Sequence, residues 1–170
     1  MALRHEILDR YEDDLFGIPV VLRHAVIKSI DDDTGREFTT IPDEEGLAAA
    51  IAMARALCPI KLRPEDIRMM RKTLGMKSKD FAAVLDMDPT RLSRLEKDTD
   101  GLGGFSEKNI RQYVCARLKR DAPAISYDPA AIVTMEFLRG GAEFPKITFE
   151  RVRLKMAESQ LKSDSWDIAA

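Results

Sequence analysis

The sequence predicts an α+β fold: a small N-terminal β-hairpin and helix, a central bundle of short helices, and a C-terminal extension of helix and strand. Two observations predict it. The stretch Ile18 to Ile30 is rich in β-branched residues, which favour strands. The stretch Pro64 to Leu118 repeats apolar residues at helical spacing. The chain has 170 residues, 45% of them apolar and 33% charged, which is typical of a folded globular protein.

The N-terminal part contains a predicted hairpin. Residues 1–15 are interpreted as a short polar helix, and residues 18–30 as a strand. Residues 31–35 (DDDTG) form a turn that leads to a second strand over residues 36–41. Pro42 ends that strand. Residues 43–57 then form a helix that is apolar almost all round, so we expect it in the core or at a dimer interface.

The middle of the chain reads as four short helices. Each helix has a few residues expected to point inward, and these are Ile67, Met70, Arg71 and Leu74; Phe81, Ala82 and Leu85; Leu92 and Leu95; and Ile110, Tyr113, Val114 and Leu118. Gly75 ends the first helix, and Ser78 opens the second. Asp88 and Pro89 start the third, as an N-cap acceptor followed by proline at the first helical position. Ser106 is expected to cap the fourth.

The C-terminal part is predicted to continue with a helix and a strand. Tyr127 to Leu138 is expected to be the helix, ended by Gly140 and Gly141, and Ile147 to Met156 favours a strand over a helix. Trp166 is interpreted as a packing anchor. These patterns divide the chain into residues 1–60, 61–120 and 121–170, for the hairpin and helix, the helical bundle and the extension.

Charge is unevenly distributed. The formal net charge is −2 overall but −5 over residues 1–62, +5 over residues 63–120 and −2 over residues 121–170. A basic middle between acidic flanks is typical of a DNA-binding module with other parts attached to it. No apolar run is long enough to span a bilayer and no apolar leader is present at the start, so we expect a cytoplasmic protein without membrane contact. Cys58 and Cys115 are far apart and outside any CxxC pair, which predicts no disulfide and no metal site.

The third short helix carries a polar outer stripe. Thr90, Arg91 and Arg94 lie on it and are the candidates for contacts with DNA bases, because arginine can form two hydrogen bonds with guanine in the major groove. Candidates for phosphate contacts flank them, and these are Lys77, Ser78, Lys79 and Lys97.

The segment from Pro64 to Asp98 resembles the Cro/cI-type (XRE) helix-turn-helix. The residues that match the family pattern are Arg71, Leu74, Gly75, Ala82, Leu85, Ser93 and Glu96. The chain departs from it where Phe81 replaces leucine, Leu92 replaces isoleucine, Lys77-Ser78 replaces Thr-Gln and Asp86 replaces the turn glycine. The resemblance implies a structural ion pair between Arg71 and Glu96 that fixes the recognition helix, which begins at Asp88 and runs to about Glu96.

A second resemblance covers Tyr11 to Asp98. This part is similar to MqsA-type antitoxin regulators, in which a zinc-binding domain precedes the helix-turn-helix. The similar stretches are YEDDLFGIPVVL, IPDEEGL and PEDIRMMRKTLGMKSKDFAAVLDMDPTRLSRLE. The cysteine pairs of those relatives are missing here, so we expect no zinc and no other cofactor, and we expect the C-terminal extension to pack on the hairpin.

The expected function is sequence-specific repression of transcription by a homodimer that binds an inverted repeat in double-stranded DNA. The resemblance extends this expectation to self-regulation and to the antitoxin of a toxin–antitoxin pair, with a toxin as protein partner. The alternative is a protein-binding antiactivator that sequesters another transcription regulator. An enzyme is the least favoured class, because no candidate catalytic group has a partner near it in the sequence. Sequence leaves open the operator, the protein partner, the dimer surface and the role of residues 121–170.

Overall fold

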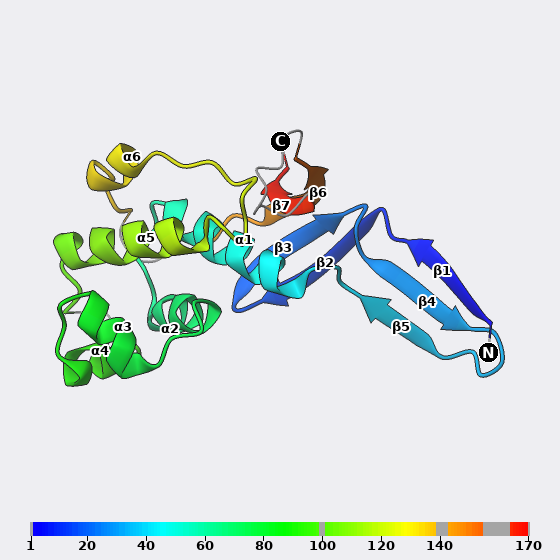
Figure 1. Cartoon of the computed structure of the whole chain (residues 1–170), viewed down its shortest axis with the longest axis horizontal. Coiled ribbons are helices and arrows are strands. Elements are labelled where there is room, and N and C mark those ends of the chain that lie inside the picture. Colours follow the sequence, from blue (N-terminus) through cyan, green and yellow to red (C-terminus); the bar gives the residue numbers. More distant parts are fainter. Residues whose placement is uncertain (1, 99–100, 139–142, 155–163, 170) are drawn as a thin grey trace.

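The computed structural model describes residues 2–98, 101–138, 143–154 and 164–169, and within them the fold is α+β. Two sheets and a group of helices share the molecule (Figure 1). The strands are β1 (Leu3–Ile7), β2 (Arg10–Leu15), β3 (Ile18–Arg23), β4 (Ile27–Asp31), β5 (Glu37–Thr40), β6 (Ile147–Arg153) and β7 (Asp164–Ile168). The helices are α1 (Glu44–Leu57), α2 (Pro64–Thr73), α3 (Ser78–Val84), α4 (Pro89–Leu95), α5 (Gly104–Leu118) and α6 (Pro129–Val133).

The N-terminal residues form strands, so the polar helix predicted over residues 1–15 is wrong. β2 pairs antiparallel with β3, and β1 pairs antiparallel with β4. The reason is long-range pairing: the apolar β3 supplies a template for hydrogen bonds that outweighs the local helical preference of a polar segment. Phe16 and Gly17 connect β2 to β3 with φ angles of 59° and 75°, as a two-residue hairpin turn requires.

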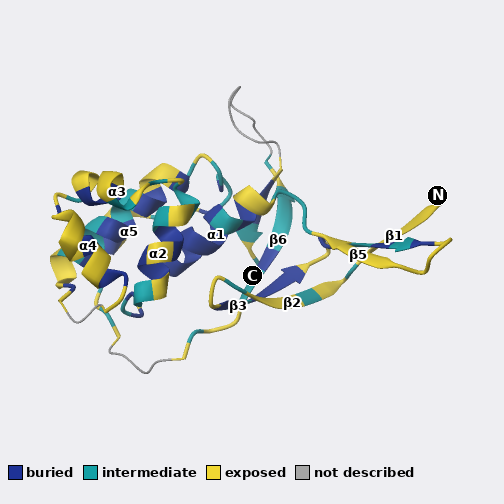
Figure 2. Ribbon diagram, turned by 90° about the horizontal axis from the view of Figure 1, so that it is seen from below, coloured by how far each residue is buried: buried dark blue, intermediate teal, exposed yellow. Residues whose placement is uncertain are grey.

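The long strand predicted over residues 18–30 is divided into β3 and β4. His24 has a φ of 48° at the division, and its N–H donates to the carbonyl of Asp9. The residues between β3 and β4 bend the hairpin at this point. β1 and β4 therefore point away from the helices and, together with β5, project as an arm (Figures 1 and 2). The turn over residues 31–35 and the strand that follows it are confirmed.

The C-terminal extension packs on the hairpin, as expected. β6 pairs parallel with β3, and β7 pairs antiparallel with β6, which gives a sheet in the order β2-β3-β6-β7. Trp166 on β7 is fully buried, and its indole N–H reaches the carbonyls of Pro42 and Asp43, both at 3.2 Å. The extension therefore closes over the start of α1.

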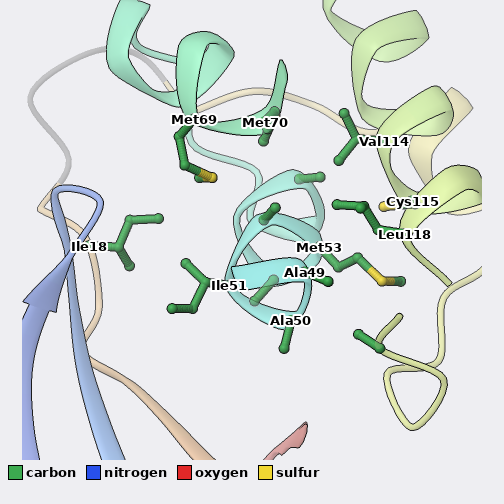
Figure 3. Close-up of a cluster of buried hydrophobic side chains, with 14 of the residues drawn as sticks. Ile18, Ala49, Ala50, Ile51, Met53, Met69, Met70, Val114, Cys115 and Leu118 are labelled. Atoms are coloured by element: carbon green, nitrogen blue, oxygen red, sulfur yellow. The ribbon is translucent and has the colours of Figure 1, made fainter. Parts of the chain in front are cut away.

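Helix α1 is the central element of the core. Nearly all of its side chains are buried, which agrees with its apolar sequence. Ile51 points toward Ile18 of β3, and Met53 points toward Cys115 and Leu118 of α5 (Figure 3). Asp43 caps the helix, since its carboxylate accepts a hydrogen bond from the N–H of Gly46 at 3.1 Å. A Cβ at position 46 would lie 2.1 Å from that carboxylate, which explains the glycine.

The four short helices of the middle are confirmed, with different ends. The N-cap of α5 is Gly103 rather than the predicted Ser106, so the helix begins three residues earlier than expected. α6 ends at Val133, so the helix predicted to continue to Leu138 is wrong. Leu138 instead forms a β-bridge with Ile60, and its N–H donates to the carbonyl of Pro59 at 2.8 Å. Gly140 and Gly141 lie outside the described residues, as does the predicted end of the strand at Met156. Cys115 is buried, and Cys58 is partly exposed.

Among the helices in the described ranges, none is both long and apolar enough to cross a membrane.

Candidate nucleic-acid interface

Helices α3 and α4 form a compact pair joined by a short turn. Asp86 in the turn has a φ of 52°, in the left-handed region that aspartate tolerates better than most residues. Met87 follows it, buried, and its N–H donates to the carbonyl of Ala82 at 2.9 Å. Leu92 and Leu95 of α4 are buried beside Phe81 of α3. The turn therefore directs one face of α4 into the core and the other face outward.

Asp88 fixes the first turn of α4. Its carboxylate accepts hydrogen bonds from the backbone N–H groups of Thr90 at 2.8 Å and Arg91 at 3.3 Å. The hydrogen bond from Thr90 contributes most to holding the pKa of Asp88 below its ordinary value. Pro89 occupies the first helical position, where its missing N–H leaves no hydrogen bond unmade.

Two arginines of α2 hold the other end of α4. Arg71 donates to both carboxylate oxygens of Glu96, at 2.5 and 3.0 Å, and to the carbonyl of Met76 at 3.1 Å. Arg68 donates to the backbone carbonyl of Glu96 at 2.6 Å. The hydrogen bonds with Glu96 raise the pKa of Arg71. α4 is therefore fastened to α2 by side-chain contacts at its C-terminal end and capped by Asp88 at its start.

The candidate base-reading residues are all on the outer face. Thr90, Arg91 and Arg94 are exposed on α4. Within the part of the chain that the structure describes, no salt bridge engages either guanidinium. The charge of Arg94 acts on the neighbouring carboxylate of Asp88, and both guanidinium groups are exposed, where an acceptor of a ligand can reach them.

The candidate phosphate-binding lysines surround this face. Lys77, Lys79 and Lys97 are exposed, on the N-cap and first turn of α3 and just after α4. Ser78 is only half exposed and is the first residue of α3. Acidic side chains are exposed among them, at Asp80, Asp86, Asp88 and Asp98, so the surface mixes these carboxylates with its five exposed cations.

A cluster of buried charged side chains, contributed by α1, α2 and α5, was not predicted from the sequence. Arg55 of α1 and Asp66 of α2 are both fully buried, and their side chains meet at 2.8 Å. Burial opposes the ionisation of Asp66, but hydrogen bonds from Arg63 and the charge of Arg55 outweigh it and keep the pKa of Asp66 below its ordinary value. The sequence feature that could have indicated this cluster is Arg55, an arginine inside the otherwise apolar run LAAAIAMARAL.

A second buried pair completes the cluster. Arg111 and Glu107 of α5 meet at 2.7 Å, and Glu107 also accepts the N–H of Leu62 at 2.8 Å. The guanidinium groups of Arg55 and Arg111 together donate to one backbone carbonyl in the last turn of α1, that of Ala56, and to three in the α1–α2 linker, those of Cys58, Ile60 and Lys61. The cluster therefore fixes how α1, α2 and α5 meet, and with them the support on which α4 rests.

Phenylalanines from the C-terminal extension cover this cluster. The ring of Phe144 lies 4.2 Å from the guanidinium carbons of both Arg55 and Arg63, and the ring of Phe137 lies 4.8 Å from that of Arg111. Such contacts between a cation and an aromatic ring are favourable. The extension thus contributes to the helical unit as well as to the sheet.

Comparison of the chain with protein-family models, with curated proteins and with solved structures finds no match in any of the three. Among the residues that the structure describes, no three His, Cys, Asp or Glu side chains are grouped so that they could hold a metal ion.

Proposed function

We propose that this protein is a sequence-specific DNA-binding repressor of transcription that acts in the cytoplasm as a dimer on an inverted repeat. The proposal rests on how helix α4 is held in place and on which of its side chains are exposed. Its inner face is buried, Asp88 caps it at one end and Arg71 and Arg68 hold it at the other, while Thr90, Arg91 and Arg94 remain exposed. A rigidly mounted helix with a polar, cationic outer face fits the major groove.

The residue types on that face match the chemistry of base recognition. An arginine guanidinium can donate two hydrogen bonds to the N7 and O6 atoms of guanine, and a threonine can bond a base edge or touch a thymine methyl group. Arg91 and Arg94 are three residues apart and therefore project from neighbouring positions of the same helix surface. Lys77, Lys79 and Lys97 can neutralise phosphates on either side, which gives affinity and register but no sequence preference.

The test is binding of the full chain to the duplex upstream of its own gene, and to duplexes selected from a random pool. Arg91→Ala and Arg94→Ala should each weaken specific binding by about 1–3 kcal/mol and change non-specific binding less. Arg36→Ala is the matched control, because Arg36 is an exposed arginine in the turn of the arm, far from α4 (Figure 1). Wild-type affinity in both α4 variants would overturn the assignment of the recognition helix.

A protein partner is the second candidate function, and one observation favours it. The arm exposes large apolar side chains on one face, including Ile7 and Phe38, and such surfaces are commonly used for protein contacts. This would suit the antitoxin role or an antiactivator that sequesters another regulator. Flat salt dependence of DNA binding, together with a protein complex that tolerates Arg91→Ala, would favour this candidate over repression.

A further inference from the structure

The three strands of the arm have two different faces. Antiparallel register places Leu3 opposite Asp31, His5 opposite Ser29, and Ile7 opposite Ile27, while Ser29 and Ile27 face Phe38 and Thr40 on β5. We call this set the apolar arm face: Leu3, His5, Ile7, Ile27, Ser29, Asp31, Phe38 and Thr40. The opposite face carries Arg4, Glu6, Lys28, Ile30, Glu37 and Thr39. The exposed charges of the paired strands are therefore all on one side.

The apolar arm face is open in the described structure. Leu3, Ile7 and Phe38 remain 41%, 61% and 50% exposed, which is high for residues of their size. Figure 2 shows the arm standing away from the helices, so no helix covers it. A sheet normally buries its apolar face against another element, and an exposed apolar face is typical of a contact surface. This face is therefore a candidate contact surface.

The charge of the face selects the kind of partner. Its one carboxylate, Asp31, is 7% exposed and accepts hydrogen bonds from the N–H groups of Asp33 at 2.9 Å and Thr34 at 3.3 Å. Toward the centre of the face, the side chains of His5 and Ser29 form a hydrogen bond with each other, with Nδ1 and Oγ 2.7 Å apart. In a two-fold contact each patch meets its own copy, so exposed charges of one sign would meet like charges. Among the residues of this face, no aspartate, glutamate, lysine or arginine side chain is exposed, and its exposed histidine, His5, is hydrogen-bonded to Ser29, which satisfies that condition.

The shape of the face also suits its own copy. A shallow hollow of about 520 Å³ lies on it, lined by His5, Ile7, Ile27, Ser29 and Thr40. Phe38 stands half exposed on β5, in the register position opposite Ser29. We propose that two copies of this chain pair through their apolar arm faces, sheet against sheet, with Phe38 of each copy packed into the hollow of the other.

The size of the face sets the strength of the pairing. Three strands of four to five residues cover roughly 16 Å by 14 Å at the usual rise and strand spacing. This is well below the roughly 800 Å² per partner of a stable complex, so we expect a weak, transient pairing. In the proposed function, this dimer places one α4 helix on each of two DNA half-sites, and this step rests on that function. Because the arm and α4 lie at opposite ends of the molecule (Figure 1), those half-sites should be more than one helical turn apart.

The test is sedimentation velocity of the full chain without DNA, over roughly 1 to 100 µM, the range of weak specific complexes. The wild type should shift from monomer to dimer across this range. Phe38→Glu should raise the dissociation constant at least about tenfold, because it places two carboxylates in the contact. Thr39→Glu adds the same charge to the same strand on the opposite face and should leave the dissociation constant unchanged. Ile7→Glu serves as a second variant on β1, and circular dichroism checks that each variant is folded.

Each outcome decides the proposal. A wild type that stays monomeric at all concentrations overturns it, and so does a dimer that Phe38→Glu and Ile7→Glu leave intact. DNA binding tests the proposed function separately. The double variant Arg91→Ala with Arg94→Ala should weaken DNA binding and leave the sedimentation behaviour unchanged. A dimer sensitive to Phe38→Glu in a chain that binds no specific DNA would uphold the surface and reject the repressor.

Discussion

The guanidinium of Arg71 in α2 donates two hydrogen bonds to the carboxylate of Glu96 at the end of α4, at 2.5 and 3.0 Å. Twenty-five residues separate the two side chains, which are 15% and 11% exposed. A paired geometry of this kind is among the stronger side-chain contacts in proteins. It couples the stability of the helical unit to the position of the exposed face of α4.

Arg71→Ala should therefore lower the free energy of unfolding by about 2–4 kcal/mol, since it leaves a largely buried carboxylate without its partner. Glu96→Gln should lower it less, because the amide oxygen still accepts one hydrogen bond. Lys72→Ala, at the neighbouring exposed position of α2, is the control and should change it by less than about 0.5 kcal/mol. Urea unfolding followed by circular dichroism gives these values. Equal stability of Arg71→Ala and the control would show that the pair does not hold α4.

The N-cap of α4 predicts a dependence of stability on pH. The pKa of Asp88 is lowered in the folded state, first by the hydrogen bond from the N–H of Thr90, so the folded state favours the carboxylate. The resulting stabilisation is fully present above the ordinary aspartate pKa of about 4 and is lost as the pH falls through the lower folded value. Asp88→Ala should lower the melting temperature at pH 7, and the difference from the wild type should shrink below pH of about 4.

Asp88→Asn separates the cap from its titration. An asparagine side chain caps a helix about as well as aspartate but does not ionise in this range. Its melting temperature should stay near that of the wild type at pH 7. A difference between wild type and Asp88→Ala that persists unchanged in acid would contradict the role of the carboxylate.

The buried pair of Arg55 and Asp66 predicts a larger effect. Asp66→Ala leaves the guanidinium of Arg55 without its carboxylate partner in the core, which should lower the free energy of unfolding by about 3–5 kcal/mol. Glu65→Ala is the matched control one position earlier. Its carboxylate is 52% exposed and lies 3.4 Å from Arg63, a surface contact worth little. Thermal unfolding of the two variants side by side should show a clearly lower transition for Asp66→Ala alone, and superimposable transitions would contradict the prediction.

The parts of the fold that could be predicted from sequence are those with local signals. Asp88-Pro89 starts α4 at the predicted residue, because capping depends on neighbours within one turn. The pairing of Arg71 with Glu96 was expected from a family resemblance, and the structure places the two side chains together. The exposure of Thr90, Arg91 and Arg94 follows from helical spacing against Leu92 and Leu95.

The parts that could not be predicted depend on distant partners. The polar residues of β2 form a strand because β3 lies beside them, and nothing in the local sequence of residues 1–15 indicates this. The pairing of β3 with β6 joins Val20 to Ile147 across most of the chain. The cluster around Arg55 brings together side chains from α1, α2 and α5, so its charges appear in the sequence as unrelated residues.

Electrostatics of the lysines around α4 give the final prediction. Each phosphate that a lysine neutralises releases counterions, so the logarithm of the binding constant should fall linearly with the logarithm of salt concentration. Lys77→Ala, Lys79→Ala and Lys97→Ala should each reduce that slope by about 1 and weaken specific and non-specific duplexes alike, because a phosphate contact carries no sequence information. Arg91→Ala should instead reduce the difference in affinity between the specific and the non-specific duplex. Fluorescence anisotropy between roughly 50 and 200 mM salt measures both quantities. A slope that none of the lysine variants changes would show that this surface does not face the DNA backbone.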